Sequence, residues 1–217
     1  MNMLNEKPTG PRAKQKEATG RAVLEAAREE FERVGFEAAN VRSIAQRAGV
    51  SAGTVLHHYG DKRDLLHAAL FDDLERTLRK AVAAPEGETL DARLSGLTRS
   101  VFRYYQKRPQ LSRTLLKESL FAEPPWAQRF SAQVAQVHAA IATWAVDAAK
   151  KGELRAEVDA ALLGAAYFSF FYFALIAWAQ GAHPAPVQMV EHLVAQHLAG
   201  LRPPPQSKPA TQKRRRS

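Results

Sequence analysis

The sequence predicts an all-α protein of about nine helices. Three observations indicate this class: apolar residues recur at helical spacing, no stretch alternates with a period of two, and no Asn-Gly or Asp-Gly hairpin turn occurs. Glycine and proline interrupt the apolar stripes and so separate one predicted helix from the next. With 217 residues, 46% of them hydrophobic, the chain is long enough for one large domain or two small ones.

Five apolar stripes, with steps of three or four residues, mark the helices whose limits are clearest. They occupy residues 23–34, 65–78, 90–104, 134–148 and 187–201. Gly35, Pro109 and Gly152 follow the first, third and fourth stripes, where glycine and proline are expected to end the helices. The break at residues 85–88, Pro-Glu-Gly-Glu, separates the second stripe from the third and is the best candidate for a domain boundary.

Most of the positive charge lies at one end of the chain. The net charge is +9, and residues 202–217 contribute six of these charges because they contain six Lys or Arg and no Asp or Glu. The remainder is nearly neutral, so net charge by itself does not indicate nucleic-acid binding. The polar segment 1–16 is predicted to be a flexible arm, and segment 202–217 a disordered basic tail.

Composition and motifs exclude several kinds of chemistry. The chain has no cysteine, which excludes disulfides, thiolate metal sites and cysteine nucleophiles and suits a reducing cytoplasm. The first twenty residues contain no apolar signal-peptide core. We find no phosphate-binding glycine loop, no nucleophile elbow and no cluster with metal-ligand spacing. We therefore predict a cytoplasmic protein without catalytic residues, metal ion or cofactor.

The most specific local pattern begins at Asn40. Its side chain can cap a helix at 41–48, and Gly49 ends that helix where a residue tolerant of positive φ is needed. Ser51 then caps a second helix at 52–59. Two short helices joined by a tight turn that contains glycine form a helix-turn-helix.

The second of these helices has the features of a helix that enters DNA. It begins with the small residues Ala52, Gly53 and Thr54, so its first turn fits a major groove without collision. Asp61 caps the following helix, whose first turn carries Lys62 and Arg63. Cations at this end of a helix are unfavourable because they oppose the helix dipole, and a nearby phosphate would compensate them. Amphipathic helix pairs also occur in proteins that never bind DNA, so the pattern alone leaves both interpretations open.

The same region resembles the DNA-binding domain of the tetracycline-repressor (TetR) family, over roughly residues 18–70. The residues that carry the resemblance are Arg21, Leu24-Glu25-Ala26-Ala27, Phe31, Gly35-Phe36, residues 41–55, His58-Tyr59, Lys62 and Leu65-Leu66. It implies an all-helical, ligand-responsive homodimer, usually a repressor, that binds a palindromic operator in double-stranded DNA. The DNA-binding domain would occupy residues 17–62, and a ligand-binding and dimerisation domain residues 63–201.

The resemblance also implies which residues contact DNA. They are Arg42, Ser51, Ala52, Gly53, Thr54, His57, His58, Tyr59 and Lys62. Lys62 corresponds to a lysine that contacts phosphate, so its removal is expected to reduce the salt dependence of DNA binding. The chain departs from the family at Leu56, where a phosphate-contacting tyrosine is usual, and at Ala39, where threonine is common. Arg42, Lys62 and Arg63 are then expected to supply more of the phosphate contacts.

Residues 160–179 contain no charged side chain and are long enough to span a membrane. One interpretation is therefore a membrane-tethered helical protein. The other, which we favour, is a buried helix of a soluble protein, because the hydrophobicity is only moderate. The resemblance implies that a ligand covers one side of this helix and a dimer partner the other. The residues expected at the dimer interface are Gly164, Ala165, Phe171, Val190 and Val194.

A small effector is expected among the aromatic and aliphatic residues of the C-terminal half. The candidates for ligand contact are Phe102, Tyr105, Leu115, Ser119, Phe121, Trp126, His138, Ile141, Phe168 and Tyr172. Few of them are charged, which favours an apolar or aromatic ligand. For each aromatic residue in this set, a place in the hydrophobic core is an equally good interpretation.

Overall fold

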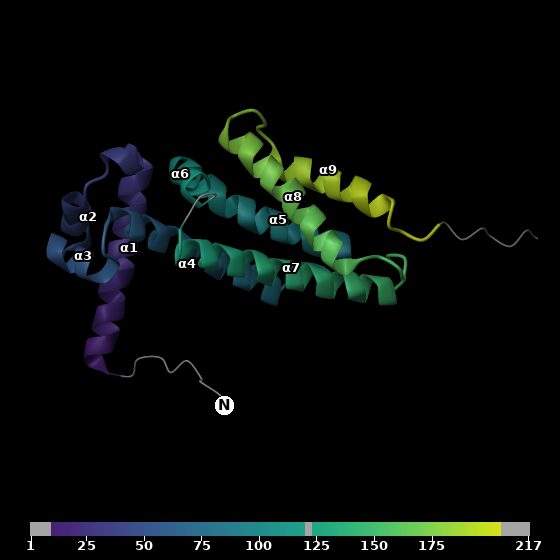
Figure 1. The fold of residues 1–217 in the computed structure, drawn as a ribbon, viewed down its shortest axis with the longest axis horizontal. Helices are drawn as coiled ribbons and strands as arrows, with labels where there is room; N and C mark the ends of the chain where they lie inside the picture. Colours follow the sequence, from purple (N-terminus) through teal and green to yellow (C-terminus); the bar gives the residue numbers. More distant parts are fainter. Residues whose placement is uncertain (1–9, 120–122, 205–217) are drawn as a thin grey trace, which may run out of the picture.

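A computed structural model describes residues 10–119 and 123–204, except for the side chain of Ser119. Within these ranges the chain forms nine α-helices and no strand (Figure 1), which confirms the predicted all-α class. The helices are α1 (Pro11–Ala38), α2 (Val41–Ala48), α3 (Ala52–Tyr59), α4 (Lys62–Ala83), α5 (Leu90–Lys107), α6 (Pro109–Ser119), α7 (Trp126–Lys150), α8 (Ala160–Ala179) and α9 (Pro186–Ala199).

The first helix starts earlier than predicted. The segment 1–16 was expected to be a flexible arm, whereas α1 begins at Pro11 and makes residues 11–16 helical. Proline suits the first position of a helix because the missing N–H has no helical partner there, and the residues that follow include strong helix formers. Residues 1–9 lie outside the described part of the chain.

The caps predicted around the short helices are present. The Asn40 side chain accepts from the N–H of Arg42 at 2.8 Å, and that of Ser51 accepts from the N–H of Thr54 at 3.0 Å. Gly49 has a φ of 69°, the left-handed conformation that glycine adopts without steric cost. The Asp61 side chain accepts from the N–H of Asp64 at 2.8 Å and starts α4. Local sequence therefore determines where α2, α3 and α4 begin.

Helix α4 connects the three-helix N-terminal unit to the C-terminal bundle (Figure 1). It packs against α1 and α3 and also against α5 and α7. One continuous hydrophobic core extends from Val23 in α1 to Leu198 in α9. The two predicted domains thus share α4 and this core. The packing continues across both of the expected domain boundaries, the one at residue 62 and the one at residues 85–88.

One side of helix α8 packs against α7 and α9, and the other side faces solvent. Gly164 packs against α7, where the Cα of His138 lies 3.5 Å from the position that a Cβ on Gly164 would take, an ordinary van der Waals distance. On the outward face, Leu162 is 66% exposed and Phe173 is 60% exposed. In the described chain, α8 alone is long and apolar enough to cross a membrane, and a third of its apolar window is buried.

The C-terminal segment is partly anchored. Residue 202 was expected to begin a disordered tail, but Arg202 forms an ion pair with Asp91 at 2.7 Å and donates to both carboxylate oxygens. A single guanidinium nitrogen, Nη2, makes both contacts, and this ion pair holds the segment after α9 near the start of α5. Residues 205–217 lie outside the described part of the chain.

His67 generates a prediction about stability and pH. Its ring is 3% exposed and stacks on Phe71 and Trp126, with centroids 5.9 and 5.2 Å away. Burial lowers the pKa of His67, although the nearby carboxylates of Glu118 and Asp64 act in the opposite direction. A lowered pKa means that the unfolded chain binds the proton more strongly. The stability due to neutral His67 is therefore present above pH about 6.5 and is lost as the pH falls from there through the lowered pKa.

We expect the His67→Phe variant to lose less stability than the parent when the pH falls from about 7 to about 5. Phenylalanine keeps the stacking and removes the titrating group. Urea unfolding at a series of pH values measures the difference. If the two proteins show the same pH dependence over this range, His67 does not contribute to it.

Candidate DNA-binding surface and ligand cavity

The outward side of α3 is free of contacts with the protein core. Val55 is buried and anchors the helix, whereas Gly53 and His57 are exposed and Leu56 is 44% exposed. Arg42 in α2 is also exposed and forms no ion pair with the described residues. The short helix α3 therefore presents small, apolar and imidazole groups, flanked by a guanidinium.

Two hydroxyl groups organise the first turn of α3. The Ser51 and Thr54 oxygens lie 2.9 Å apart and share a hydrogen bond, while the Ser51 oxygen also accepts from the Thr54 N–H. Because this cap holds the turn rigidly, both hydroxyls are already placed at the exposed end of the helix. Ala52 and Gly53 add no bulk there, so the turn can approach a base edge closely.

Tyr59 and Lys62, both predicted to contact DNA, instead bind α1. The Tyr59 hydroxyl donates to the carbonyl of Gly20 at 3.0 Å. The Lys62 ammonium donates to the carbonyls of Phe36, Glu37 and Ala39 at 2.9, 3.1 and 3.2 Å.

All three hydrogens of the Lys62 ammonium thus have acceptors at the end of α1, and the charge lies 4.7 Å from the centroid of the Phe36 ring. Carbonyls at a helix C-terminus attract cations through the helix dipole. The physical reason for the difference from the sequence prediction is the turn at Gly35, which brings the end of α1 over the start of α4.

Of the predicted DNA residues, His57 and His58 of α3 and Arg63 of α4 remain to be placed. His58 is half-buried and its ring contacts the rings of His57 and Tyr59, with centroids 6.0 and 5.9 Å away. His57 is more exposed than His58, so only His57 has most of its ring available on the outer surface. Arg63 is exposed and lies 3.6 Å from a Glu118 oxygen.

Sequence reasoning missed a second group of cations. Arg12, Lys14 and Lys16 are exposed in the first turns of α1, and that turn contains no acidic residue. Cations at a helix N-terminus oppose the dipole and are unfavourable unless an anion compensates them. Figure 1 shows these turns projecting past α3. The proline-rich composition of the segment concealed its helical character.

A small apolar cavity lies between α4, α5, α7 and α8. Its volume is about 60 Å³, and we call it the apolar cavity. Of the predicted ligand residues, it brings together Tyr105, Phe168 and Tyr172. The other residues that line it are Leu74, Leu78, Leu97, Val101, Phe130, Gln133, Val134, Val137, Tyr167 and Phe171.

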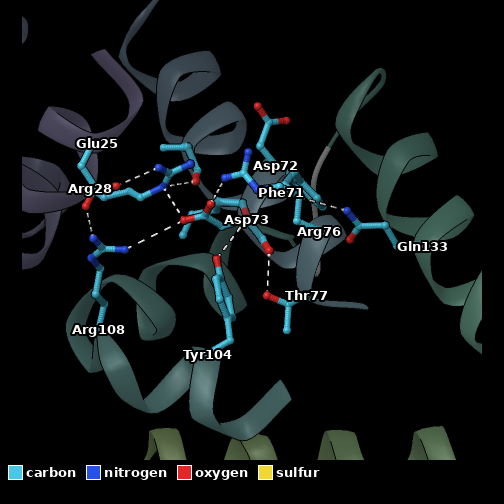
Figure 2. A network of polar contacts seen from close by, with 12 residues as sticks. Glu25, Arg28, Phe71, Asp72, Asp73, Arg76, Thr77, Tyr104, Arg108 and Gln133 are labelled. Atoms are coloured by element: carbon cyan, nitrogen blue, oxygen red, sulfur yellow. Dashed lines mark hydrogen bonds and ion pairs between the residues drawn. The ribbon is translucent and has the colours of Figure 1, made fainter. Parts of the chain in front are cut away.

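One polar atom in the apolar cavity is unsatisfied. Gln133 is buried, and its amide nitrogen donates to the carbonyl of Phe71 at 3.3 Å, as Figure 2 shows. Its amide oxygen is buried and has no hydrogen-bond partner in the described chain. Tyr167 bonds to the Thr98 hydroxyl at 2.9 Å, and burial raises its pKa, so the phenol stays neutral. The lining of the cavity is thus mostly apolar and includes Gln133, whose amide oxygen has no partner in the described chain.

The other predicted ligand residues do not line this cavity. Phe102, Leu115 and Ile141 are buried in the core, where Phe102 packs on Phe171 with centroids 4.7 Å apart. His138 packs edge-on against Phe168, with centroids 5.6 Å apart. Trp126 donates to an Asp64 oxygen at 2.8 Å. The side chain of Ser119 and all of Phe121 lie outside the described residues.

Four of the five predicted dimer residues face the interior of the described chain. Gly164 contacts α7, Phe171 packs on Phe102, and Val190 and Val194 are buried in the core. Only Ala165 is exposed on the outward face of α8. Helical periodicity groups residues that share a face but does not say which face turns inward. The exposed apolar side chains on the opposite face are those of Leu162 and Phe173.

Comparison with known proteins relates the N-terminal unit to regulators. A family model described as "Bacterial regulatory proteins, tetR family" matches residues 23–69. The HTH-type transcriptional repressor Rv1474c of Mycobacterium tuberculosis is 34% identical over 124 residues, which cover 54% of this chain and 61% of that repressor. The chain therefore matches less than two thirds of the length of this curated relative.

Solved structures share the fold along most of the chain. GusR from Salmonella enterica has a TM-score of 0.65 and 26% identity, with 89% of this chain and 100% of GusR covered. A TetR transcription regulator from Haloarcula marismortui has a TM-score of 0.73 and 20% identity, with 85% of this chain and 98% of that protein covered. These similarities do not support the interpretation of α8 as a membrane anchor.

We expect Lys62→Met to lower the free energy of unfolding by about 1–3 kcal/mol, because three carbonyls lose their shared charged donor. The salt dependence of DNA binding should stay as in the parent, because the ammonium contacts α1 and not phosphate. Urea unfolding and anisotropy titrations at several salt concentrations measure the two effects. Arg63→Met, which removes the neighbouring exposed cation, is the control for stability. A weaker salt dependence in the Lys62 variant alone would favour the phosphate contact instead.

Proposed function

We propose that the chain, as a member of the TetR family of bacterial regulatory proteins, is a cytoplasmic, homodimeric transcriptional repressor that responds to a small ligand. The observation that carries the proposal is the exposed side of α3, where a capped first turn presents small residues and His57, while Arg42 is exposed on α2. A helix of this kind docks in a major groove with its N-terminal residues toward the bases.

Recognition would divide between base contacts and phosphate contacts. Thr54 and His57 are suited to hydrogen bonds with base edges, and Leu56 to an apolar contact such as a thymine methyl group. Arg42 and the cations at the start of α1 are suited to phosphate, since their charges are exposed and lack ion-pair partners in the described chain. These α1 residues take the part that sequence reasoning had given to Lys62.

A two-fold dimer would place two copies of α3 on a palindromic operator. Two half-sites one helical turn apart require recognition helices separated by about 34–36 Å. The outward face of α8 supports this assembly, because Leu162, Ala165, Ser169 and Phe173 form an uncharged exposed stripe. Burying a large apolar side chain contributes about 1.5–3 kcal/mol, and a two-fold interface buries each of these residues twice.

The effector would enter the apolar cavity. Sites for drug-sized ligands have volumes of about 300–1,000 Å³, so the effector has to displace side chains that now fill the space. We propose a largely apolar or aromatic ligand with one hydrogen-bond donor, because the amide oxygen of Gln133 is the available acceptor. Leu74 and Leu78 belong to α4, so their displacement would alter the position of α3 and shift the population away from the DNA-binding form.

We expect Arg42→Ala and Thr54→Ala each to weaken operator binding by about 1–3 kcal/mol. The operator is first identified by selection from randomised duplexes with the parent protein, and titrations then compare operator with unrelated DNA. In contrast, the double variant Lys14→Gln/Lys16→Gln should weaken binding to all sequences alike and reduce its salt dependence. Operator affinity that is unchanged in both single variants would exclude this surface as the DNA-binding site.

We expect Leu162→Asp and Phe173→Asp to dissociate the dimer, because each places a charge in an apolar interface on both sides of the two-fold axis. Sedimentation velocity at micromolar concentration measures the oligomeric state. Ala135→Asp, at an exposed position of α7, is the matched control and should leave the dimer intact. If both α8 variants remain dimeric, the interface lies on another surface.

A further inference from the structure

A groove of about 560 Å³ runs between α4 and α5 and reaches α1 and α6. It is distinct from the apolar cavity because the two use different faces of the same helices. Leu74 and Leu78 of α4 line the cavity, whereas Thr77 and Lys80 line the groove. Its volume lies within the range of small-molecule sites. We call it the cationic groove.

Basic residues dominate the lining of the cationic groove. They are Arg28, Arg76, Lys80, Arg103, Lys107 and Arg108, and the acidic residues are Asp73 and Glu86. Figure 2 shows the end of the groove near α1, where Arg28, Arg76 and Arg108 surround Asp73. At the other end, Glu86 pairs with Arg99 at 2.9 Å. The two carboxylates are therefore already engaged.

Three of these cations have no ion-pair partner among the described residues. Lys80, Arg103 and Lys107 are exposed and form no ion pair with a described carboxylate. Arg103 and Lys107 are four residues apart on α5, and Lys80 has the same spacing from Arg76 on α4. Like charges at this spacing destabilise a helix by a few tenths of a kcal/mol per pair. Arg76 is paired with Asp73, so the cations without an ion-pair partner in the described chain are Lys80 on the α4 wall and Arg103 and Lys107 on the α5 wall, an arrangement that a bound anion would stabilise.

The cationic groove also offers contacts for the organic part of a ligand. Leu70, Leu111 and the half-buried ring of Tyr104 line the end near α1. The Tyr104 hydroxyl donates to the Leu70 carbonyl at 3.1 Å, so that ring is fixed in place. Arg28 lines the same end, is 5% exposed, and has one guanidinium nitrogen, Nη2, that is buried without an acceptor in the described chain.

We propose that the cationic groove binds a phosphorylated small molecule that carries at least two negative charges. Its phosphate oxygens would bind the side chains of Lys80, Arg103 and Lys107, and its organic part would lie against Tyr104 and Leu111. Phosphate accepts several charge-assisted hydrogen bonds at once, which suits cations that come from two facing helices. The site uses none of the residues assigned to DNA contact or to the apolar cavity, so it stands or falls separately from the proposed function.

The test uses the full chain and inorganic pyrophosphate as the probe, with binding measured by isothermal titration calorimetry at low salt. The groove variant is Lys80→Gln/Arg103→Gln/Lys107→Gln. The control variant, Arg113→Gln/Lys117→Gln/Lys150→Gln, removes three exposed cations that do not line the groove. Both variants lose the same net charge and keep residues 202–217, so only the place of the lost charges differs. Because all six positions are exposed, the substitutions are expected to leave the fold intact, and circular dichroism checks this.

The parent is expected to bind pyrophosphate with a dissociation constant below about 1 mM. The groove variant should bind at least about tenfold more weakly, and the control variant within about twofold of the parent. Equal losses in the two variants would assign the affinity to overall charge and overturn the proposal. Binding by the parent weaker than about 1 mM would also overturn it.

Discussion

Arg28 joins the three-helix N-terminal unit to the bundle through a guanidinium that is buried between α1 and α4. Its Nε donates to the Ala69 carbonyl at 2.6 Å and lies 2.9 Å from an Asp73 oxygen, and a further nitrogen pairs with Glu25 at 3.0 Å. Arg108 at the end of α5 pairs with the same Glu25 (Figure 2). A buried charge is tolerated only with its partners in place, so this network holds α1 in one position relative to α4 and α5.

Helices α4 and α5 separate an apolar site from a positively charged one. The apolar cavity lies on the side toward α7 and α8, and the cationic groove on the side toward α1 and α6. Both sites include residues of α4, which begins directly after the helix-turn-helix. A movement of α4 caused by either ligand would therefore reach α3 through the contacts of α4 with α1 and α3. Coupling of this kind needs a ligand that binds one position of α4 better than another.

Helix α8 shows why an apolar pattern does not by itself indicate which face of a helix turns inward. The bounds 160–179 followed from the absence of charge and from the flanking breaks, and the structure has the helix at these residues. Because nearly every position is apolar, the sequence contains no contrast between an inward and an outward face. Packing against α7 through Gly164 sets the rotation of the helix and leaves Leu162 and Phe173 outside. Four of the five residues predicted for the dimer interface are therefore buried inside the described chain, and only Ala165 is exposed.

The sequence by itself determined the all-α class, the helix-turn-helix and its caps, because each cap depends on atoms only two or three residues apart. The resemblance to a known family also followed from that local pattern. Only the tertiary structure decided how Lys62 and Tyr59 are used, since their partners in α1 lie more than twenty residues away. The cationic groove likewise exists only because α4 and α5 bring their basic residues face to face. Periodicity says which residues share a face, whereas the folded chain decides what that face meets.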